Sequence, residues 1–255
     1  MRVVRLQGMD IEKFIKNILE IEFGYHVTKI REGNEESPDF FVNGNGECLL
    51  IELKSKFDDK GTARNIENTF RQGQIAEFSD ITSRKNTISK MILKASNQLA
   101  SIDIDVDYRI IWMIAIDRNA EMKKCQFKAS LYGTATIADL DLQQTVSCYY
   151  FGFNDFYRTQ NVVDAALIST MGEVELCLNT YSPNYHKIKK SFLVQKLGNA
   201  CCDPFQKEKE NRAMIVDADI DRRDKKLVLQ YLRKKYNRKK LQVMQGHYHS
   251  SLFSV

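Results

Sequence analysis

The sequence contains no apolar run that approaches the ~20 residues needed to span a membrane as a helix. Residues 1–10 lack the basic, apolar and small-residue regions of a secretory signal, so none is expected. A hydrophobic content of 43% with 28% charged residues is ordinary for globular proteins and excludes disordered, collagen-like and low-complexity classes. No phosphate-binding loop, dinucleotide-binding glycine motif, helix-turn-helix or zinc finger is present. A chain of 255 residues with these properties is expected to be a cytoplasmic protein of one large or two small domains.

The cysteines form no C-x-x-C pair, the spacing typical of zinc ribbons and redox motifs. Several lie in apolar runs, and two are adjacent in the chain, where they rarely pair with each other. The pattern favours reduced, partly buried thiols of a cytosolic protein, with zinc ligation as the alternative. The six residues are Cys48, Cys125, Cys148, Cys177, Cys201 and Cys202.

The first 117 residues have the pattern of a mixed α/β domain. Apolar residues recur at helical spacing after Asp10, a suitable N-cap, and Gly24 suits the position after the last turn. The run from Asn43 to Gly46 (NGNG) predicts a hairpin, because Asn and Gly accept positive φ. The expected order is helix 10–23, strands 25–30, 39–42 and 47–54, an irregular insertion 55–80, helix 82–100 and strand 109–116. This is an αβββαβ core, with a mixed central sheet flanked by helices.

Residues 118–255 are expected to form a C-terminal α/β extension, with the boundary placed near 118–123. Strands are expected near 125–131, 146–153, 173–178, 213–218 and 241–248, and helices near 161–169, 184–197 and 222–236.

All of the excess positive charge is C-terminal. Residues 203–255 hold 13 Lys and Arg against 7 Asp and Glu, whereas the other residues hold 25 against 26. Residues 222–240 alone contain ten basic residues and one acid, which favours either a polyanionic partner or a solvated helix face. The basic residues expected to contact nucleic acid are Arg222, Lys226, Arg233, Lys234, Lys235, Lys239 and Lys240.

The stretch most informative about chemistry is Ser37-Pro38-Asp39, followed after twelve residues by Glu52-Leu53-Lys54. Side chains alternate along a strand, so Glu52 and Lys54 project from one face while Leu53 projects into the core. The hairpin brings Asp39 back to the same end of the sheet. Two carboxylates suit Mg²⁺, with the Leu53 carbonyl as a further ligand, and an ammonium group suits a phosphodiester substrate. The alternative is a purely structural role, in which Glu52 and Lys54 form an ion pair at the rim of the sheet and Asp39 is a turn residue.

The first helix offers a third acid. At 100° per residue, Glu12 lies at the edge of the apolar stripe and can lean over the sheet. Glu22 lies near the centre of the stripe. It is the second choice because it is in the last turn, where the helix frays.

A helix with an acid before Gly-aromatic, then Pro-Asp, then an apolar strand ending in Glu-x-Lys resembles the PD-(D/E)XK nuclease superfamily. The pattern is similar to that of archaeal Holliday-junction resolvases and Mrr-like restriction enzymes, and it covers residues 10–117. The resemblance implies a restriction-endonuclease-like core with Asp39, Glu52 and Lys54 as the catalytic motif. It also implies Glu12 as the helix acid and a polar residue on the second core helix, either Gln98 or Lys94.

The resemblance thus implies a Mg²⁺-dependent nuclease, with Mn²⁺ able to substitute, of the DNA endonuclease type used in restriction or defence. Its expected substrate is double-stranded DNA, and a homodimer is expected because one active site meets one strand. A non-catalytic nucleic-acid-binding or assembly module on the same fold is the alternative.

Overall fold

The computed structural model describes residues 10–31, 36–57, 60–115, 117–170, 172–244 and 248–253. The chain folds into two compact units, each built from separated segments of the sequence. The first comprises Met1–Ser55, Met91–Ile116 and Thr159–Cys202, and the second comprises Lys56–Lys90, Asp117–Arg158 and Asp203–Val255. Each unit therefore includes residues from both sides of the boundary placed near 118–123.

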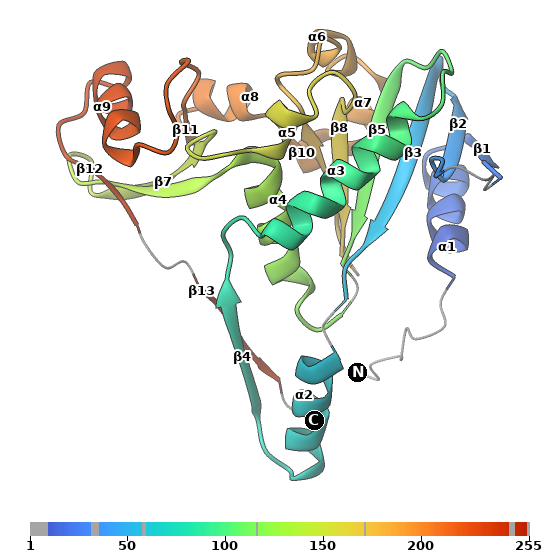
Figure 1. Ribbon diagram of the computed structural model, residues 1–255, viewed down its shortest axis with the longest axis horizontal. Helices are drawn as coiled ribbons and strands as arrows, with labels where there is room; N and C mark the ends of the chain where they lie inside the picture. The colour runs from blue at the N-terminus through green and yellow to red at the C-terminus, as the bar shows by residue number, and fades with distance from the viewer. Residues whose placement is uncertain are drawn as a thin grey trace. The chain divides into compact units, whose positions relative to one another are not determined.

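The first unit is built on a seven-stranded mixed sheet with the order β1-β2-β3-β5-β8-β9-β10 (Figure 1). Antiparallel pairs join β1 to β2, β2 to β3 and β8 to β9, and the other neighbours are parallel. The predicted α/β class with a mixed central sheet is thus confirmed. The strands are β1 (His26–Lys29), β2 (Phe40–Gly44), β3 (Glu47–Ser55), β5 (Tyr108–Ile114), β8 (Ala165–Ser169), β9 (Val174–Leu178) and β10 (Cys201–Cys202).

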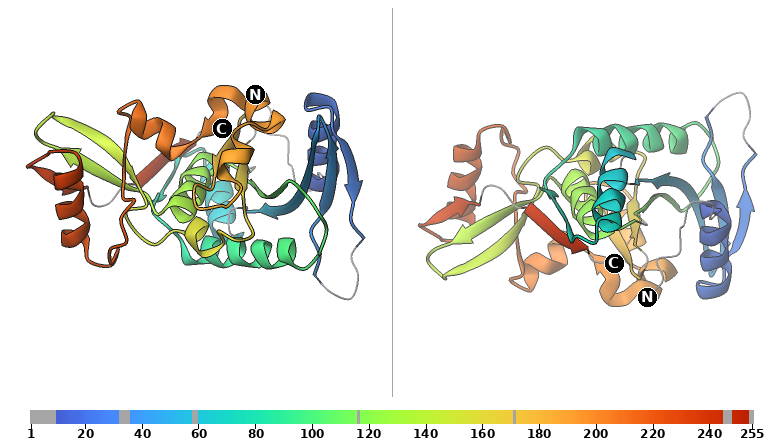
Figure 2. Two further views of the ribbon diagram at one scale, coloured as in Figure 1. Left: turned by 90° about the horizontal axis from the view of Figure 1, so that it is seen from above. Right: turned by 90° about the horizontal axis from the view of Figure 1, so that it is seen from below.

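Helices flank this sheet on both faces, with α3 on one face and α6 and α7 on the other (Figure 2). Helix α3 begins in the second unit and belongs to the first from Met91 onwards. The helices that contribute to the first unit are α1 (Ile11–Asn17), the π-helix η1 (Ile18–Glu22), α3 (Asn86–Ala100), α6 (Tyr185–Ile188), α7 (Phe192–Leu197) and the 3₁₀ helix η2 (Gly198–Ala200).

Local signals explain the first helix and the hairpin. The Asp10 carboxylate accepts a hydrogen bond from the Lys13 N–H at 3.1 Å, as an N-cap does. The chain leaves η1 through Gly24 at φ +71°, a conformation that L side chains rarely adopt. In the turn between β2 and β3, Asn45 and Gly46 take φ values of 51° and 79°, as the Asn-Gly pattern predicts.

The second unit contains a four-stranded sheet with the order β11-β7-β6-β12 and a two-stranded ribbon of β4 and β13. Its strands are β4 (Ala76–Ile81), β6 (Ala135–Asp139), β7 (Gln144–Tyr149), β11 (Ala213–Ile215), β12 (Leu241–Val243) and β13 (Tyr248–Phe253). Besides the first turn of α3, its helices are α2 (Lys60–Arg71), α4 (Ala120–Tyr132), α5 (Asp155–Arg158), α8 (Pro204–Lys209) and α9 (Lys225–Lys235).

Three expectations for individual segments are wrong. Residues 125–131 lie in helix α4, which is buried on most sides and therefore shows no apolar stripe. Residues 165–169 form the fully buried strand β8 instead of a helix, because a strand covered on both faces loses its alternation. Residues 55–80, expected to be irregular, contain α2 and β4.

No helix among the described residues is long and apolar enough to cross a membrane.

Candidate active site

Asp39 is fixed at the point where β2 meets the end of β3. Its N–H donates to the Ile51 carbonyl at 3.1 Å, and its own carbonyl accepts from the Ile30 N–H at 2.9 Å. Its carboxylate oxygen Oδ2 accepts from the Leu53 N–H at 2.7 Å. The hairpin thus brings Asp39 beside Glu52 and Lys54 in space, although twelve residues separate the two motifs in the sequence.

Glu52 is a buried carboxylate with an incomplete set of partners. Its side chain projects from β3 directly after the core residue Ile51, and only 1% of Glu52 is exposed, whereas Leu53 is partly exposed. Oε1 accepts a hydrogen bond from the Lys54 ammonium. Oε2 is buried and has no hydrogen-bond donor within the part of the chain that the structure describes, and the Asp39 carboxyl group lies close enough to Glu52 to share a proton with it. Such an oxygen is costly in a folded protein, and it marks a place where a further ligand would be stabilising.

The electrostatics of Glu52 reflect this position. Burial raises the pKa of its carboxyl group to about 8, and the neighbouring negative charge of Asp39 raises it further, against the opposing effect of Lys54. Ionised Glu52 would meet both the repulsion of Asp39 and the loss of hydration, so in the metal-free protein it keeps a proton up to about pH 8. A divalent cation would relieve both the repulsion and the loss of hydration.

Lys54 is held between Glu52 and helix α3. Its ammonium group donates to Glu52 and also to Oε1 of Gln98 at 2.6 Å. Gln98 in turn donates from Nε2 to the Ser37 carbonyl at 3.3 Å. Of the two polar candidates on this helix, Gln98 contacts the lysine, whereas Lys94 forms an exposed ion pair with Glu36 at 2.6 Å.

Ser37 also belongs to this group, although the sequence indicated no role for it beyond its place in the Ser37-Pro38-Asp39 stretch. Its carbonyl orients Gln98, and its hydroxyl oxygen is buried without a hydrogen-bond partner among the described residues. The available signal was its position directly before Pro38-Asp39.

The acids of the first helix are not brought to this group. The Glu12 carboxylate is engaged by Lys29 of β1. Lys29 pairs with Phe40 across the sheet, and Phe40 pairs with Ile51, so these three side chains lie on one face. Glu52 follows Ile51 in the strand and therefore projects from the other face. The second choice, Glu22, is exposed at the end of η1.

The basic C-terminal segment divides into structural and exposed residues, all in the second unit. Arg222 donates to the Val216 carbonyl at 3.0 Å, and Arg233 donates to the Leu241 carbonyl at 2.9 Å. Lys235 forms ion pairs with Glu208 at 2.7 Å and with Asp217 at 2.9 Å. Four of the basic residues predicted to bind nucleic acid remain exposed, namely Lys226, Lys234, Lys239 and Lys240.

No protein-family model, curated protein or solved structure matches this chain. The interpretation of the site therefore rests on the geometry of its own residues.

Proposed function

We propose that this chain is a Mg²⁺-dependent nuclease that hydrolyses phosphodiester bonds, and specifically a DNA endonuclease of restriction or defence type. The observation that carries the proposal is the buried, unpartnered oxygen of Glu52 beside Asp39 and Lys54. The order α1-β1-β2-β3-α3-β5, with α2 and β4 inserted, supports a restriction-endonuclease-like core.

The donor set fits a hard divalent cation. Asp39 and Glu52 supply carboxylate oxygens, with the Leu53 carbonyl as the further ligand suggested by the sequence, and Mg²⁺ prefers oxygen ligands of this kind. When bound, the ion would polarise the scissile phosphate and lower the pKa of a water ligand.

The chain's own residues have distinct tasks in this proposal. Lys54, as an ammonium group, orients the attacking water and offsets negative charge that develops on the phosphate oxygens. Gln98 is a positioning residue that holds the Lys54 ammonium through its Oε1. Glu12 has no task at this site, because it pairs with Lys29 on the other face of the sheet.

Cleavage of supercoiled plasmid tests the proposal. The reduced full-length protein should nick or linearise DNA in Mg²⁺ or Mn²⁺, and chelation with EDTA should stop the reaction. Calorimetry should show Mn²⁺ binding to the wild type. Asp39→Ala should abolish it, because the buried Glu52 would then be the one carboxylate left of the proposed pair. DNA binding without cleavage under all of these conditions would instead favour a non-catalytic nucleic-acid-binding or assembly module.

Double-stranded DNA is the proposed partner, held in part by the exposed lysines of the C-terminal segment. For every DNA phosphate that the protein no longer neutralises, the slope of log affinity against log salt should fall by about 0.9. Replacing Lys226, Lys234, Lys239 and Lys240 together by Gln should therefore flatten the slope by up to about 3 to 4 and weaken binding similarly across sequences. Fluorescence anisotropy at several salt concentrations measures this slope.

A variant with the same loss of charge provides the control. Lys13, Lys90, Lys190 and Lys196 are also exposed, and their replacement by Gln removes four charges from other surfaces. Equal flattening by both sets would show that net charge alone determines the salt dependence. An unchanged slope in the first set would make the segment a solvated helix face.

A homodimer completes the proposal, because two chains acting together bring one site to each strand of the duplex. Sedimentation of the protein on a short duplex gives the number of chains bound.

A further inference from the structure

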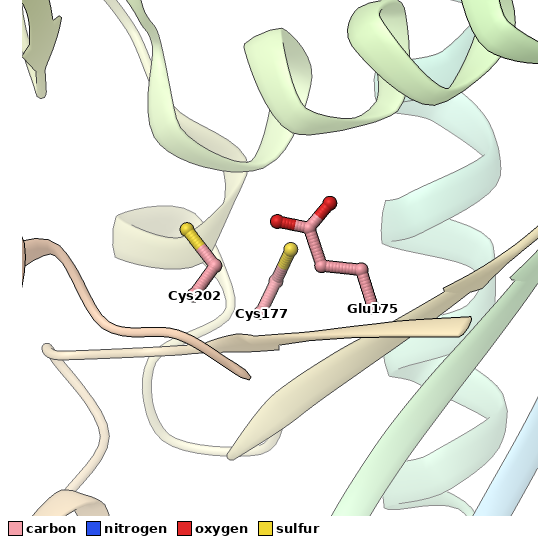
Figure 3. A group of neighbouring side chains, drawn as sticks. All are labelled: Glu175, Cys177 and Cys202. Atoms are coloured by element: carbon pink, nitrogen blue, oxygen red, sulfur yellow. The ribbon is translucent and has the colours of Figure 1, made fainter. Parts of the chain in front are cut away.

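A second group of metal-ligating side chains lies at the other end of the strand order, on β9 and β10. Cys202 of β10 is the register partner of Cys177 of β9, in a parallel pairing. Glu175 precedes Cys177 by two residues, so both side chains project from the same face of β9. Figure 3 shows the three side chains rising from one side of these strands. One ligand atom of each lies within 4.8 Å of the others.

The burial of the group suits a bound ion. Cys177 and Cys202 are exposed by 0% and 1%, whereas Glu175 is partly exposed. The two thiols thus lie in the low-dielectric interior, and the carboxylate lies where an ion would enter from solvent. A tetrahedral site with metal–sulfur bonds of about 2.3 Å places its two sulfurs about 3.8 Å apart, so shifts of about 1 Å suffice to close the group.

The chemistry of the donors selects the class of ion. Thiolates are soft ligands that favour Zn²⁺ and related ions over Mg²⁺ and Ca²⁺. Two thiolates and one carboxylate give a site with three protein ligands, which leaves a fourth position for water or another donor. Asp39 and Glu52 offer only oxygen, so the two groups differ in the ions that they would bind.

We propose that Glu175, Cys177 and Cys202 bind a thiophilic divalent cation of the Zn²⁺ class. Binding would hold the Cys177 and Cys202 sulfurs as thiolates, release their protons and join the short edge strand β10 to β9. This proposal goes beyond nuclease activity and does not depend on it, because none of its ligands belongs to the Asp39–Glu52 site.

Titration of the reduced full-length protein with Co²⁺ under anaerobic conditions tests the site. Co²⁺ bound by thiolates gives a charge-transfer absorption that carboxylate-bound Co²⁺ lacks. We expect one equivalent of Co²⁺ to produce this band and Zn²⁺ to displace it. Cys177→Ser and Cys202→Ser should each abolish the band, and Glu175→Gln should weaken Co²⁺ binding at least about tenfold.

Two variants serve as controls. Cys201→Ser changes the neighbouring thiol, which projects from the opposite face of β10, and should leave the band unchanged. Asp39→Ala should also leave it unchanged, which separates this site from the proposed nuclease centre. Loss of the band in Cys201→Ser to the same degree as in Cys177→Ser would overturn the assignment, as would a wild-type protein that gives no band.

A measurement on the unmodified protein covers the case in which a serine variant fails to fold. One equivalent of Zn²⁺ should protect two thiols against slow alkylation, and mass spectrometry should map them to Cys177 and Cys202. Protection of another pair, or none at all, would contradict the proposal.

Discussion

Replacing Lys54 with Ala is expected to lower the rate of metal-dependent DNA cleavage by about 10²–10³-fold, the usual cost of removing one group that stabilises transition-state charge. The ammonium of Lys54 is held by Glu52 and Gln98 at the end of β3 and is only 16% exposed, so water cannot replace it in the same position. DNA affinity should change little, because the main phosphate contacts are proposed elsewhere. Single-turnover cleavage combined with anisotropy separates the two quantities.

Lys187→Ala is the matched control for this variant. Lys187 also pairs with a carboxylate of the same unit, Asp107, at 2.6 Å, and Asp107 accepts from the N–H of Cys48, near the beginning of β3. Its loss should leave cleavage within about threefold of the wild-type rate, since exposed ion pairs contribute little. Gln98→Ala should lower kcat more than it raises KM, as expected of a residue that positions Lys54. A Lys54→Ala variant that cleaves at the wild-type rate would remove the lysine from the proposed mechanism.

The sequence was sufficient where local rules determine the geometry. The Asn-Gly turn sets the register of β2 against β3, and strand alternation then places Glu52 and Lys54 on one face beside Asp39. The resemblance to the nuclease superfamily implied that a polar residue of the second core helix would approach the site. It left Gln98 and Lys94 as alternatives, because the rotation of a helix against a sheet depends on packing between distant parts of the chain.

Non-local packing also explains what the sequence did not reveal. Strand β8 is covered on both faces, so its Ala-Ala-Leu-Ile sequence lacks the alternation of a half-buried strand and is equally compatible with a buried helix. Its pairing with β5 and β9 makes it a strand. The proximity of Cys177 and Cys202 follows from the pairing of β9 with β10, which no spacing in the sequence encodes. For Glu12, the helix stripe predicted a lean towards the sheet but not the competing ion pair with Lys29.

In the metal-free protein, Glu52→Gln is expected to increase stability at pH 8 by a few kcal/mol relative to the wild type. Burial raises the pKa of Glu52 from its ordinary value of 4.5 to about 8, so the folded state keeps a proton that the unfolded chain releases. The carboxyl group therefore contributes its full stability below pH 4.5 and loses it as the pH rises to about 8. Each pH unit within this window costs up to about 1.4 kcal/mol. Glutamine does not titrate and carries no charge to bury.

Urea unfolding in EDTA between pH 5 and pH 8 measures this effect as the difference in unfolding free energy between the wild type and Glu52→Gln. Other titrating groups largely cancel in that difference, which should grow steadily in favour of the variant as the pH rises. Asp39→Asn tests the cause, because removal of the neighbouring charge should lower the pKa of Glu52. The pH range over which the protein loses stability should then end at a lower pH. Saturating Mg²⁺ should reduce the difference by binding the folded wild type. If the unfolding free energies of the wild type and Glu52→Gln change in parallel with pH, Glu52 ionises in the folded protein without cost. That result would contradict the proposal of a metal ion at its unpartnered oxygen.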